Sequence, residues 1–147
     1  MKKLTPVLAV LLIVVLAVVG YFVANGSAKA EILKAEDGVL VFRINETIDN
    51  ATVLDALAYL KQEGLITYTA QSSTYGAYIT EINGVSEYGT FSWMLYCNDA
   101  SASTTEYGSF TYDEIVLGSC SYGASTQPVL KGCIYAIVLE DWSTMYA

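Results

Sequence analysis

The chain has 147 residues, of which 54% are hydrophobic and 15% charged, and its formal net charge is −8 at pH 7. It contains no histidine, which excludes the Ser-His-Asp and Cys-His nucleophile arrangements and removes the commonest zinc ligand. The acidic balance, without a basic patch in the sequence, excludes nucleic acid and anionic lipid as partners of the domain.

The first thirty residues carry the pattern of an export signal. Two lysines precede an unbroken apolar run over 7–19, and Ala28-Lys29-Ala30 gives the small-x-small pattern of a signal peptidase site before Glu31. Counting residues 21–24, the apolar stretch approaches the roughly 20 residues that span a bilayer. Residues 1–30 are therefore a cleaved signal peptide, our preferred interpretation, or an uncleaved membrane anchor. In both cases we expect an exported protein, secreted or held on the outer face of the cytoplasmic membrane.

Residues 31–147 are expected to form one domain. Without the first thirty residues, four basic residues remain against fifteen acidic ones, and the formal charge moves from −8 to −11 because three lysines are removed. A chain of this length buries roughly two-thirds of its unfolded surface. Its many Tyr, Thr, Ser, Val and Ile residues favour strands.

A hairpin and a helix are predicted at the start of this domain. Apolar runs at 32–33 and 39–44 flank Glu36-Asp37-Gly38, and Asp-Gly favours a tight hairpin turn. A helix is predicted over 52–63, because apolar residues recur there at helical spacing.

Capping signals bound the predicted helix at both ends. Thr52 and Asp55 have the spacing of a capping box. Gly64 ends the helix as a C′ glycine, and Leu65 follows it. The helix boundaries therefore rest on local signals.

The rest of the chain is predicted to form strands and turns, with a polar loop at 101–106. The predicted strands are 77–82, 91–98, 108–112, 115–122 and 129–140. The order of hairpin, helix and several strands predicts an α+β domain. We expect a small, mostly antiparallel or mixed β-sheet, β-grasp-like, with one helix packed across it.

One segment concentrates glycine and aromatic residues. Residues 75–85 predict a strand hinged on glycine and an Asn-Gly turn, and 91–96 predicts a second strand headed by tryptophan. Strand alternation places Trp93 on one face and Tyr96 on the other. Since a single helix covers only one face of a sheet, one aromatic row is expected to stay partly open. The pattern alone leaves Trp93 undecided between a core residue and a ligand contact.

The three cysteines are Cys97, Cys120 and Cys133. If 120–133 forms two strands around a turn at Thr126-Gln127, Cys120 and Cys133 face each other within disulfide reach. We predict this bridge, with Cys97 free; the alternative is three buried, reduced cysteines. Cys97 becomes a candidate nucleophile only if it is exposed and its pKa is lowered.

The acidic residues predict no catalytic site. Glu36-Asp37, Asp113-Glu114 and Glu140-Asp141 are neighbours on presumed turns or strand ends, where their side chains point apart and stay solvated. Glycoside hydrolysis requires two carboxyl groups facing one substrate. Asn98-Asp99 lacks the alternating ligands of an EF-hand loop. We therefore predict neither an enzyme nor a metal site.

The motif Tyr75-Gly76-x-Tyr78-Ile79-x-x-Ile82-x-Gly84-Val85, followed by Phe91-x-Trp93-x-x-Tyr96, resembles the C-terminal β domain of transcobalamin and intrinsic factor. It is more similar still to the bacterial transcobalamin-like C-terminal (DUF4430) family. In the vitamin carriers this domain closes over cobalamin. The resemblance implies six candidate ligand-binding residues, which are Tyr75, Gly76, Tyr78, Trp93, Tyr96 and Asn98. The large helical barrel that forms the other half of the carriers' clamp has no counterpart in this chain.

We therefore expect a non-catalytic ligand-binding module of the cell envelope. The resemblance implies cobalamin or a related corrinoid as ligand, with no other cofactor. Half a clamp buries half the ligand, so the affinity should be far below that of the carriers. The alternative is a surface module for protein–protein interaction or adhesion without a small-molecule ligand.

Overall fold

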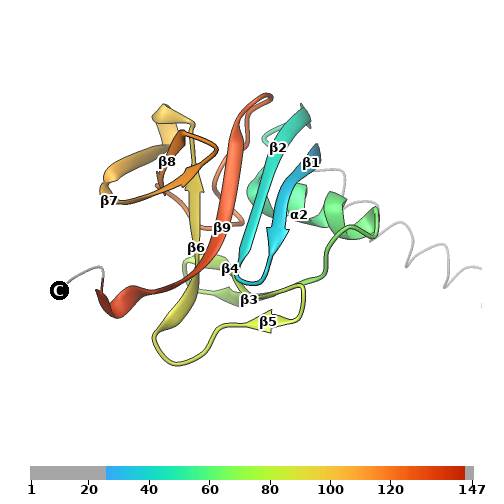
Figure 1. The fold of residues 1–147 in the computed structure, drawn as a ribbon. Coiled ribbons are helices and arrows are strands. Elements are labelled where there is room, and N and C mark those ends of the chain that lie inside the picture. Colours follow the sequence, from blue (N-terminus) through green and yellow to red (C-terminus); the bar gives the residue numbers. More distant parts are fainter. Residues whose placement is uncertain (1–25, 145–147) are drawn as a thin grey trace, which may run out of the picture.

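The computed structural model describes residues 26–144, so the predicted export signal lies, up to residue 25, outside the described residues. These described residues form two β-sheets and one α-helix (Figure 1). The larger sheet comprises β1 (Ser27–Glu36), β2 (Val39–Ile48), β6 (Phe91–Cys97), β7 (Ser103–Tyr112), β8 (Ile115–Cys120) and β9 (Ile134–Asp141). The smaller sheet comprises β3 (Tyr68–Ser73), β4 (Gly76–Ile82) and β5 (Val85–Ser86). The helix is α2 (Val53–Gln62), and two short 3-10 turns are η1 (Ala100–Ala102) and η2 (Trp142–Thr144).

The strand order of the larger sheet is β1-β2-β9-β6-β8-β7, and that of the smaller sheet is β3-β4-β5. Neighbouring strands in both sheets pair antiparallel. In Figure 1, α2 lies behind β1 and β2, and the smaller sheet lies across the lower end of the larger one. The predicted α+β class, mostly antiparallel with one helix, is confirmed. Within residues 26–144, no helix is both long and apolar enough to cross a membrane.

The local turn and cap signals are found where the sequence predicts them. Gly38 has φ +80° in the two-residue turn between β1 and β2. The carboxylate of Asp55 accepts a hydrogen bond from the backbone N–H of Thr52 at 2.8 Å, and the Thr52 hydroxyl accepts one from the backbone N–H of Asp55 at 3.4 Å. This capping box satisfies N–H groups that a helix start otherwise leaves unpaired.

A Schellman motif ends the helix. The backbone N–H of Leu65 donates to the carbonyl of Leu60 at 3.0 Å, and that of Gly64 donates to Lys61 at 3.0 Å. Gly64 has φ +75°, which glycine adopts without a Cβ penalty. The helix buries one stripe, formed by Val53, Ala56, Leu57 and Leu60.

Both faces of the larger sheet are buried, because its central strands are apolar on each side. On one face, Tyr135 and Ile137 of β9 pack with α2 and with residues of the smaller sheet in a first core. On the opposite face, Ala136 and Val138 of β9 pack with Tyr96 in a second core. The period of two along each strand produces this division.

The second core is closed by the curl of the sheet itself. The hydroxyl of Tyr112, in β7, donates to the carbonyl of Leu33, in β1, at 3.4 Å, so the two edge strands approach each other. The rings of Tyr96 and Phe110 lie 6.1 Å apart. The β7–β8 hairpin therefore covers the face that α2 leaves free, and Tyr96 retains 2% exposure. The expectation of an open aromatic row is wrong at this position, because a curled sheet covers its own face.

The C-terminal segment differs from the predicted hairpin. β8 and β9 are separated in the sheet by β6, and residues 121–133 form an irregular connection between them. The side chain of Gln127 is fully buried within this connection. Cys120 and Cys133 therefore do not face each other across a ladder, and all three cysteines are free in the structure. The predicted Cys120–Cys133 disulfide is not formed.

The first strand begins earlier than the predicted domain start at Glu31. β1 begins at Ser27, and its first three residues pair with 46–48 of β2. Ala28 and Ala30 are 4% and 6% exposed and belong to the first core. The small-x-small segment that resembles a cleavage site thus lies inside a paired strand.

Candidate functional site

The candidate ligand residues Tyr75 and Gly76 lie at the tip of the β3–β4 hairpin. The Ser73 hydroxyl closes this tip: it donates to the carbonyl of Gly76 at 2.7 Å and accepts from the backbone N–H of Tyr75 at 3.2 Å. Gly76 has φ +103°. The Tyr75 side chain is 93% exposed, so its ring projects into solvent from a closed turn.

A second contact fixes the hairpin tip against the rest of the domain. The hydroxyl of Ser125 accepts a hydrogen bond from the backbone N–H of Ala77 at 2.9 Å. A Cβ added to Gly76 would lie 2.6 Å from the same hydroxyl oxygen. The sequence offered no signal for this contact, because Ser125 lies in the irregular 121–133 connection.

Tyr78 follows on the same hairpin and is 42% exposed. Its hydroxyl donates to the side-chain carbonyl of Gln71 at 2.6 Å, directly across the β3–β4 ladder. Tyr75, Gly76 and Tyr78 therefore remain together on one element, and two of them present rings to solvent. Such rings combine a large apolar surface with a polar handle, which suits a binding surface.

The Asn-Gly turn that follows β4 is present, but its second strand is β5 and not β6. Asn83 and Gly84 have φ +50° and +81°, the pattern of a type I′ turn, and Ile82 pairs with Val85. β6, which carries the tryptophan, belongs to the larger sheet. The segments 75–85 and 91–96 are thus neighbours from different sheets.

Trp93 joins these two sheets. Its indole N–H donates to the carbonyl of Val85 at 3.2 Å, and the side chain is 9% exposed within the first core. The structure therefore places this tryptophan behind the smaller sheet, as a support for it. The remaining two candidates, Tyr96 and Asn98, lie apart from the hairpin.

Tyr96 lies on the opposite face of the larger sheet from Trp93. Burial raises the pKa of its phenol, and the neighbouring Glu140 carboxylate adds to this effect. Asn98 is exposed at the end of β6, where its side-chain oxygen accepts from the backbone N–H of Ile134 at 2.9 Å. The fold therefore does not bring the six candidates to one surface.

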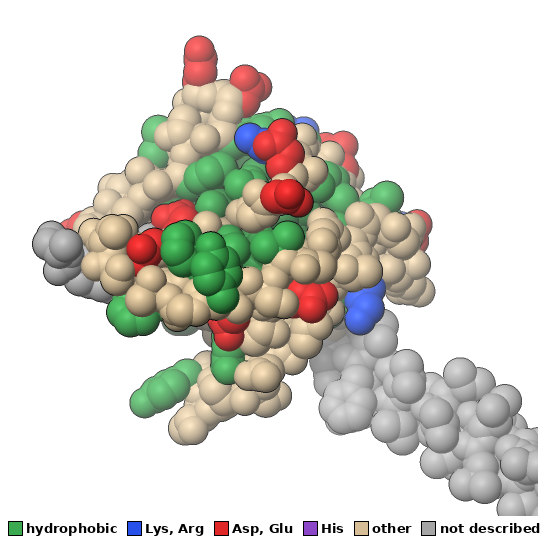
Figure 2. Space-filling view, turned by 60° about the horizontal axis from the view of Figure 1, so that its bottom comes forward, with side chains coloured by type: hydrophobic (Ala, Val, Ile, Leu, Met, Phe, Trp, Pro, Cys, Tyr) green, Lys and Arg blue, Asp and Glu red, His purple; other side chains and the backbone are tan. Residues whose placement is uncertain are grey.

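An apolar groove lies next to the junction of the two sheets, and the sequence analysis missed it. Tyr88 and Phe91 stack there with ring centroids 4.8 Å apart and an interplanar angle of 14°. The groove has a volume of about 350 Å³. Its apolar lining consists of Val39, Val85, Tyr88, Phe91, Val138 and Leu139. In Figure 2, hydrophobic side chains gather near the middle of this end of the molecule, with Asp and Glu around them.

The signal for this groove was the short spacing of two aromatic residues around Gly89. The backbone groups of Tyr88 and Phe91 exchange hydrogen bonds of 3.2 and 2.8 Å, and Gly89 has φ +54° in the turn between them. Tyr88 is 61% exposed. A tight turn with an aromatic residue at each end brings the two rings together.

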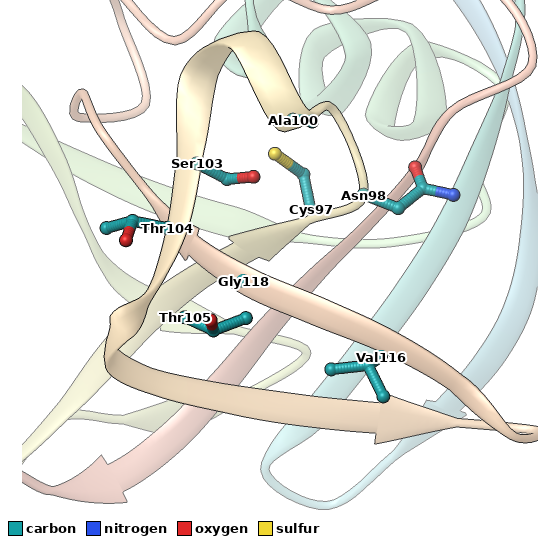
Figure 3. A pocket seen from close by; sticks show the side chains of 8 residues that line it. All are labelled: Cys97, Asn98, Ala100, Ser103, Thr104, Thr105, Val116 and Gly118. Atoms are coloured by element: carbon teal, nitrogen blue, oxygen red, sulfur yellow. The ribbon is translucent and has the colours of Figure 1, made fainter.

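Cys97 lies at a second cavity, of about 360 Å³, at the opposite end of β6 from Phe91. Figure 3 shows its sulfur directed toward the Ala100–Ser103 segment. A hydrogen bond from the Cys120 thiol lowers the pKa of Cys97 to about 7, although burial opposes this shift. Cys97 has 0% exposure, so a substrate does not reach its sulfur. The condition for a candidate nucleophile is therefore not met.

The acidic residues do not form a metal site in the described part of the chain. Within residues 26–144, no group of three or more Cys, Asp or Glu side chains is arranged to hold a metal ion. The buried carboxylate of Asp99 instead accepts hydrogen bonds from the backbone N–H and the hydroxyl of Ser101, at 3.0 and 2.6 Å. Asp99 thus caps η1.

No protein-family model matches the chain, and the comparison with curated proteins also finds no match. The resemblance to the transcobalamin-like C-terminal family therefore rests on the motif residues alone.

Proposed function

We propose that this protein is an exported, non-catalytic binding module whose β3–β4 hairpin presents aromatic rings to a flat, largely apolar ligand. The observation that carries the proposal is the 93% exposed ring of Tyr75 on a tip that Ser73 and Ser125 hold in place. An immobilised backbone that carries an exposed ring loses little conformational entropy on binding. Tyr78 extends the same surface along the hairpin.

The ligand class that we propose is a corrinoid such as cobalamin. The motif resemblance supports this choice, and so does the flat shape of a corrin ring, which suits tyrosine faces. The β-grasp-like description belongs to the same proposal. It is supported by the order of opening hairpin, helix and later strands. An open hairpin contacts one side of such a ligand, so we expect weak binding compared with a two-domain clamp.

Calorimetric titration of the full chain in mild detergent with cobalamin tests the proposal. Calorimetry is preferable to fluorescence because corrinoids absorb tryptophan emission. We expect saturable heat, with at least a tenfold weaker affinity for Tyr75→Ala. Tyr107→Ala is the matched control, because Tyr107 is 68% exposed but lies on β7. The absence of heat up to millimolar cobalamin, or an equal loss in the control, would refute the corrinoid proposal.

A second candidate function is protein binding through the open edge of β3. Among the strands of residues 26–144, β3 pairs only with β4, and most of its side chains are exposed. An extended segment of a partner can add to such an edge through main-chain hydrogen bonds. Ser72 pairs with Ala77, whose backbone N–H bonds to Ser125. The N–H of Ser72 therefore points away from β4.

The variant Ser72→Pro separates the two functions. It removes an outward N–H from the edge without breaking the β3–β4 ladder. If protein binding is the function, Ser72→Pro abolishes recovery of envelope proteins by the immobilised chain and Tyr75→Ala does not. Equal recovery by wild type and Ser72→Pro would remove the edge from consideration.

A further inference from the structure

A cysteine thiol and a glutamine amide are in contact inside the domain. The side-chain N–H of Gln127 donates a hydrogen bond to the sulfur of Cys97 at 3.7 Å. Both residues have 0% exposure. Cys97 ends β6, whereas Gln127 lies 30 residues later in the irregular 121–133 connection, so the fold brings the two together. The carbonyl carbon of the amide is bonded directly to the nitrogen that contacts the sulfur.

Two backbone groups fix the orientation of the Gln127 amide. Its oxygen accepts from the backbone N–H of Tyr122 at 3.0 Å, and its nitrogen donates to the carbonyl of Ala102 at 3.1 Å. Because the first group only donates and the second only accepts, the two ends of the amide are distinguished. The N–H of Tyr122 therefore points at the oxygen on which negative charge develops when a nucleophile adds to the carbonyl carbon, as in an oxyanion hole.

The backbone around both groups is held as well. The backbone N–H of Gln127 donates to the carbonyl of Gly123 at 2.7 Å, and its carbonyl accepts from the backbone N–H of Val53 at 3.0 Å. Cys97 pairs on both sides within the larger sheet, with β8 and with β9. Two reacting groups that are held in contact avoid the entropic cost of an encounter.

The Cys97 thiol has the properties of a nucleophile toward a group inside the protein. The Cys120 thiol lowers the pKa of Cys97 to about 7, although burial opposes this shift, so much of Cys97 is thiolate near neutral pH. The thiolate is the nucleophilic form of cysteine. In Figure 3 the sulfur is directed toward the Ala100–Ser103 segment, which carries the Ala102 carbonyl. Burial excludes an external substrate, but an electrophile within the fold needs no access.

We propose that Cys97 and Gln127 form an internal thioester bond. The sulfur of Cys97 adds to the side-chain carbonyl carbon of Gln127 and a C–S bond forms. The C–N bond of the amide then breaks, and the thiol proton leaves on the nitrogen as part of ammonia. One thiol and one primary amide thus give one thioester and one ammonia molecule, without an oxidant or a cofactor. The free thiol in the structure is the precursor, and only this form titrates at Cys97.

Burial protects the product of this reaction. A thioester is an activated acyl group, and exclusion of water from its site prevents hydrolysis. The bond crosslinks β6 to the 121–133 connection, and its acyl carbon stays reactive toward primary amines. An amine that reaches this carbon forms a C–N bond at Gln127, the C–S bond breaks, and the thiol of Cys97 is released. The domain therefore holds a latent acyl donor for amines.

Methylamine labelling and peptide mapping test the proposal. The full chain, purified in mild detergent without exposure to amines, is denatured in guanidinium chloride with or without methylamine. Free thiols are then alkylated, and the chain is digested after Glu and Lys. The cleavage points Glu87, Glu106, Glu114 and Lys131 place Cys97 on the peptide 88–106 and Gln127 on the peptide 115–131.

We expect methylamine on Gln127, and alkylation of Cys97 that increases when methylamine is present. Cys97→Ser should abolish the label, whereas the matched control Cys133→Ser should retain it. An unlabelled 115–131 peptide, with Cys97 alkylated equally in both samples, would overturn the proposal. A label confined to 82–87 would also overturn it, because the reactive group would then belong to the Asn83-Gly84 turn. The wild-type map decides the question even if a variant fails to fold.

Discussion

The hydroxyl of Ser125 occupies the space that a side chain at Gly76 would need, at 2.6 Å from where a Cβ would lie. The same hydroxyl binds the backbone N–H of Ala77 at 2.9 Å. One serine from the 121–133 connection thus both positions the β3–β4 tip and requires glycine there. The exposed ring of Tyr75 lies one residue earlier on the same tip.

We predict that Gly76→Ala lowers the free energy of unfolding by about 1–3 kcal/mol, because alanine is strained at φ +103° and clashes with Ser125. Ser125→Ala should cost about 1 kcal/mol through the lost hydrogen bond. In the double variant the clash is relieved while the backbone strain remains. Its loss of unfolding free energy should therefore be smaller than the sum of the losses in the two single variants. Urea unfolding of the four proteins measures this coupling; strict additivity would show that the close approach is absent.

Substitutions of Trp93 and Tyr75 should differ in their effect on stability, because one side chain is buried and the other is exposed. Trp93→Ala removes a buried indole and its hydrogen bond to Val85, and should lower the free energy of unfolding by about 3–5 kcal/mol. Tyr75→Ala should change it by less than about 0.5 kcal/mol, because the ring is exposed. Urea midpoints followed by circular dichroism check both values. A large stability loss in Tyr75→Ala would show that this ring is packed in solution.

Removal of residues 1–30 should destabilise the domain relative to removal of residues 1–25. The longer truncation deletes Ala28 and Ala30 from the first core and four residue pairs from the β1–β2 ladder. We expect a loss of about 2–4 kcal/mol from buried area and ladder hydrogen bonds. Thermal and urea unfolding of the two truncated proteins compare them directly. Equal stability would mean that 27–30 contribute nothing to the fold and that cleavage after Ala30 is harmless.

The stability of the reduced protein should be highest near pH 9. The pKa of Cys97 is about 7 in the folded protein against an ordinary value of 9.0, so between these values the unfolded chain holds a proton that the folded chain has lost. The free energy of unfolding therefore rises with pH across this window, by on the order of 1 kcal/mol. Above pH 9 it falls, because burial and the hydrogen bond to Cys97 keep the Cys120 thiol protonated in the folded state.

The variant Cys97→Ser supplies the control for this pH dependence. It removes the thiol whose pKa is lowered, so the rise between pH 7 and 9 should vanish. Urea midpoints at pH 6, 8 and 10 in the presence of reductant test this expectation. An identical rise in both proteins would assign it to other groups.

The sequence predicted those features whose causes are local. The capping box of Thr52 and Asp55, the Asp37-Gly38 turn and the Asn83-Gly84 turn each depend on a few adjacent residues. Such signals act before tertiary contacts form. They gave the class of the fold and the position of its helix.

Features that depend on distant strands could not be predicted in this way. β6 lies between β8 and β9, so neighbouring segments in the chain are not neighbours in the sheet, and the Cys120–Cys133 pairing was lost with the hairpin. The burial of Tyr96 follows from the curl that brings Tyr112 to Leu33, which are far apart in sequence. Of the candidate ligand residues, Tyr75 and Tyr78 have exposed rings, whereas Trp93 supports the hairpin from behind.

The strand order also determines when the domain can fold. β9 is the last strand in the chain, yet it lies in the middle of the larger sheet, between β2 and β6. The opening hairpin therefore has no partner strand in the larger sheet until the ribosome has added residues 134–141. Topologies dominated by such distant contacts fold slowly. Late completion of the larger sheet would suit the export that we propose, because a chain that has not yet folded can pass through a narrow secretion channel.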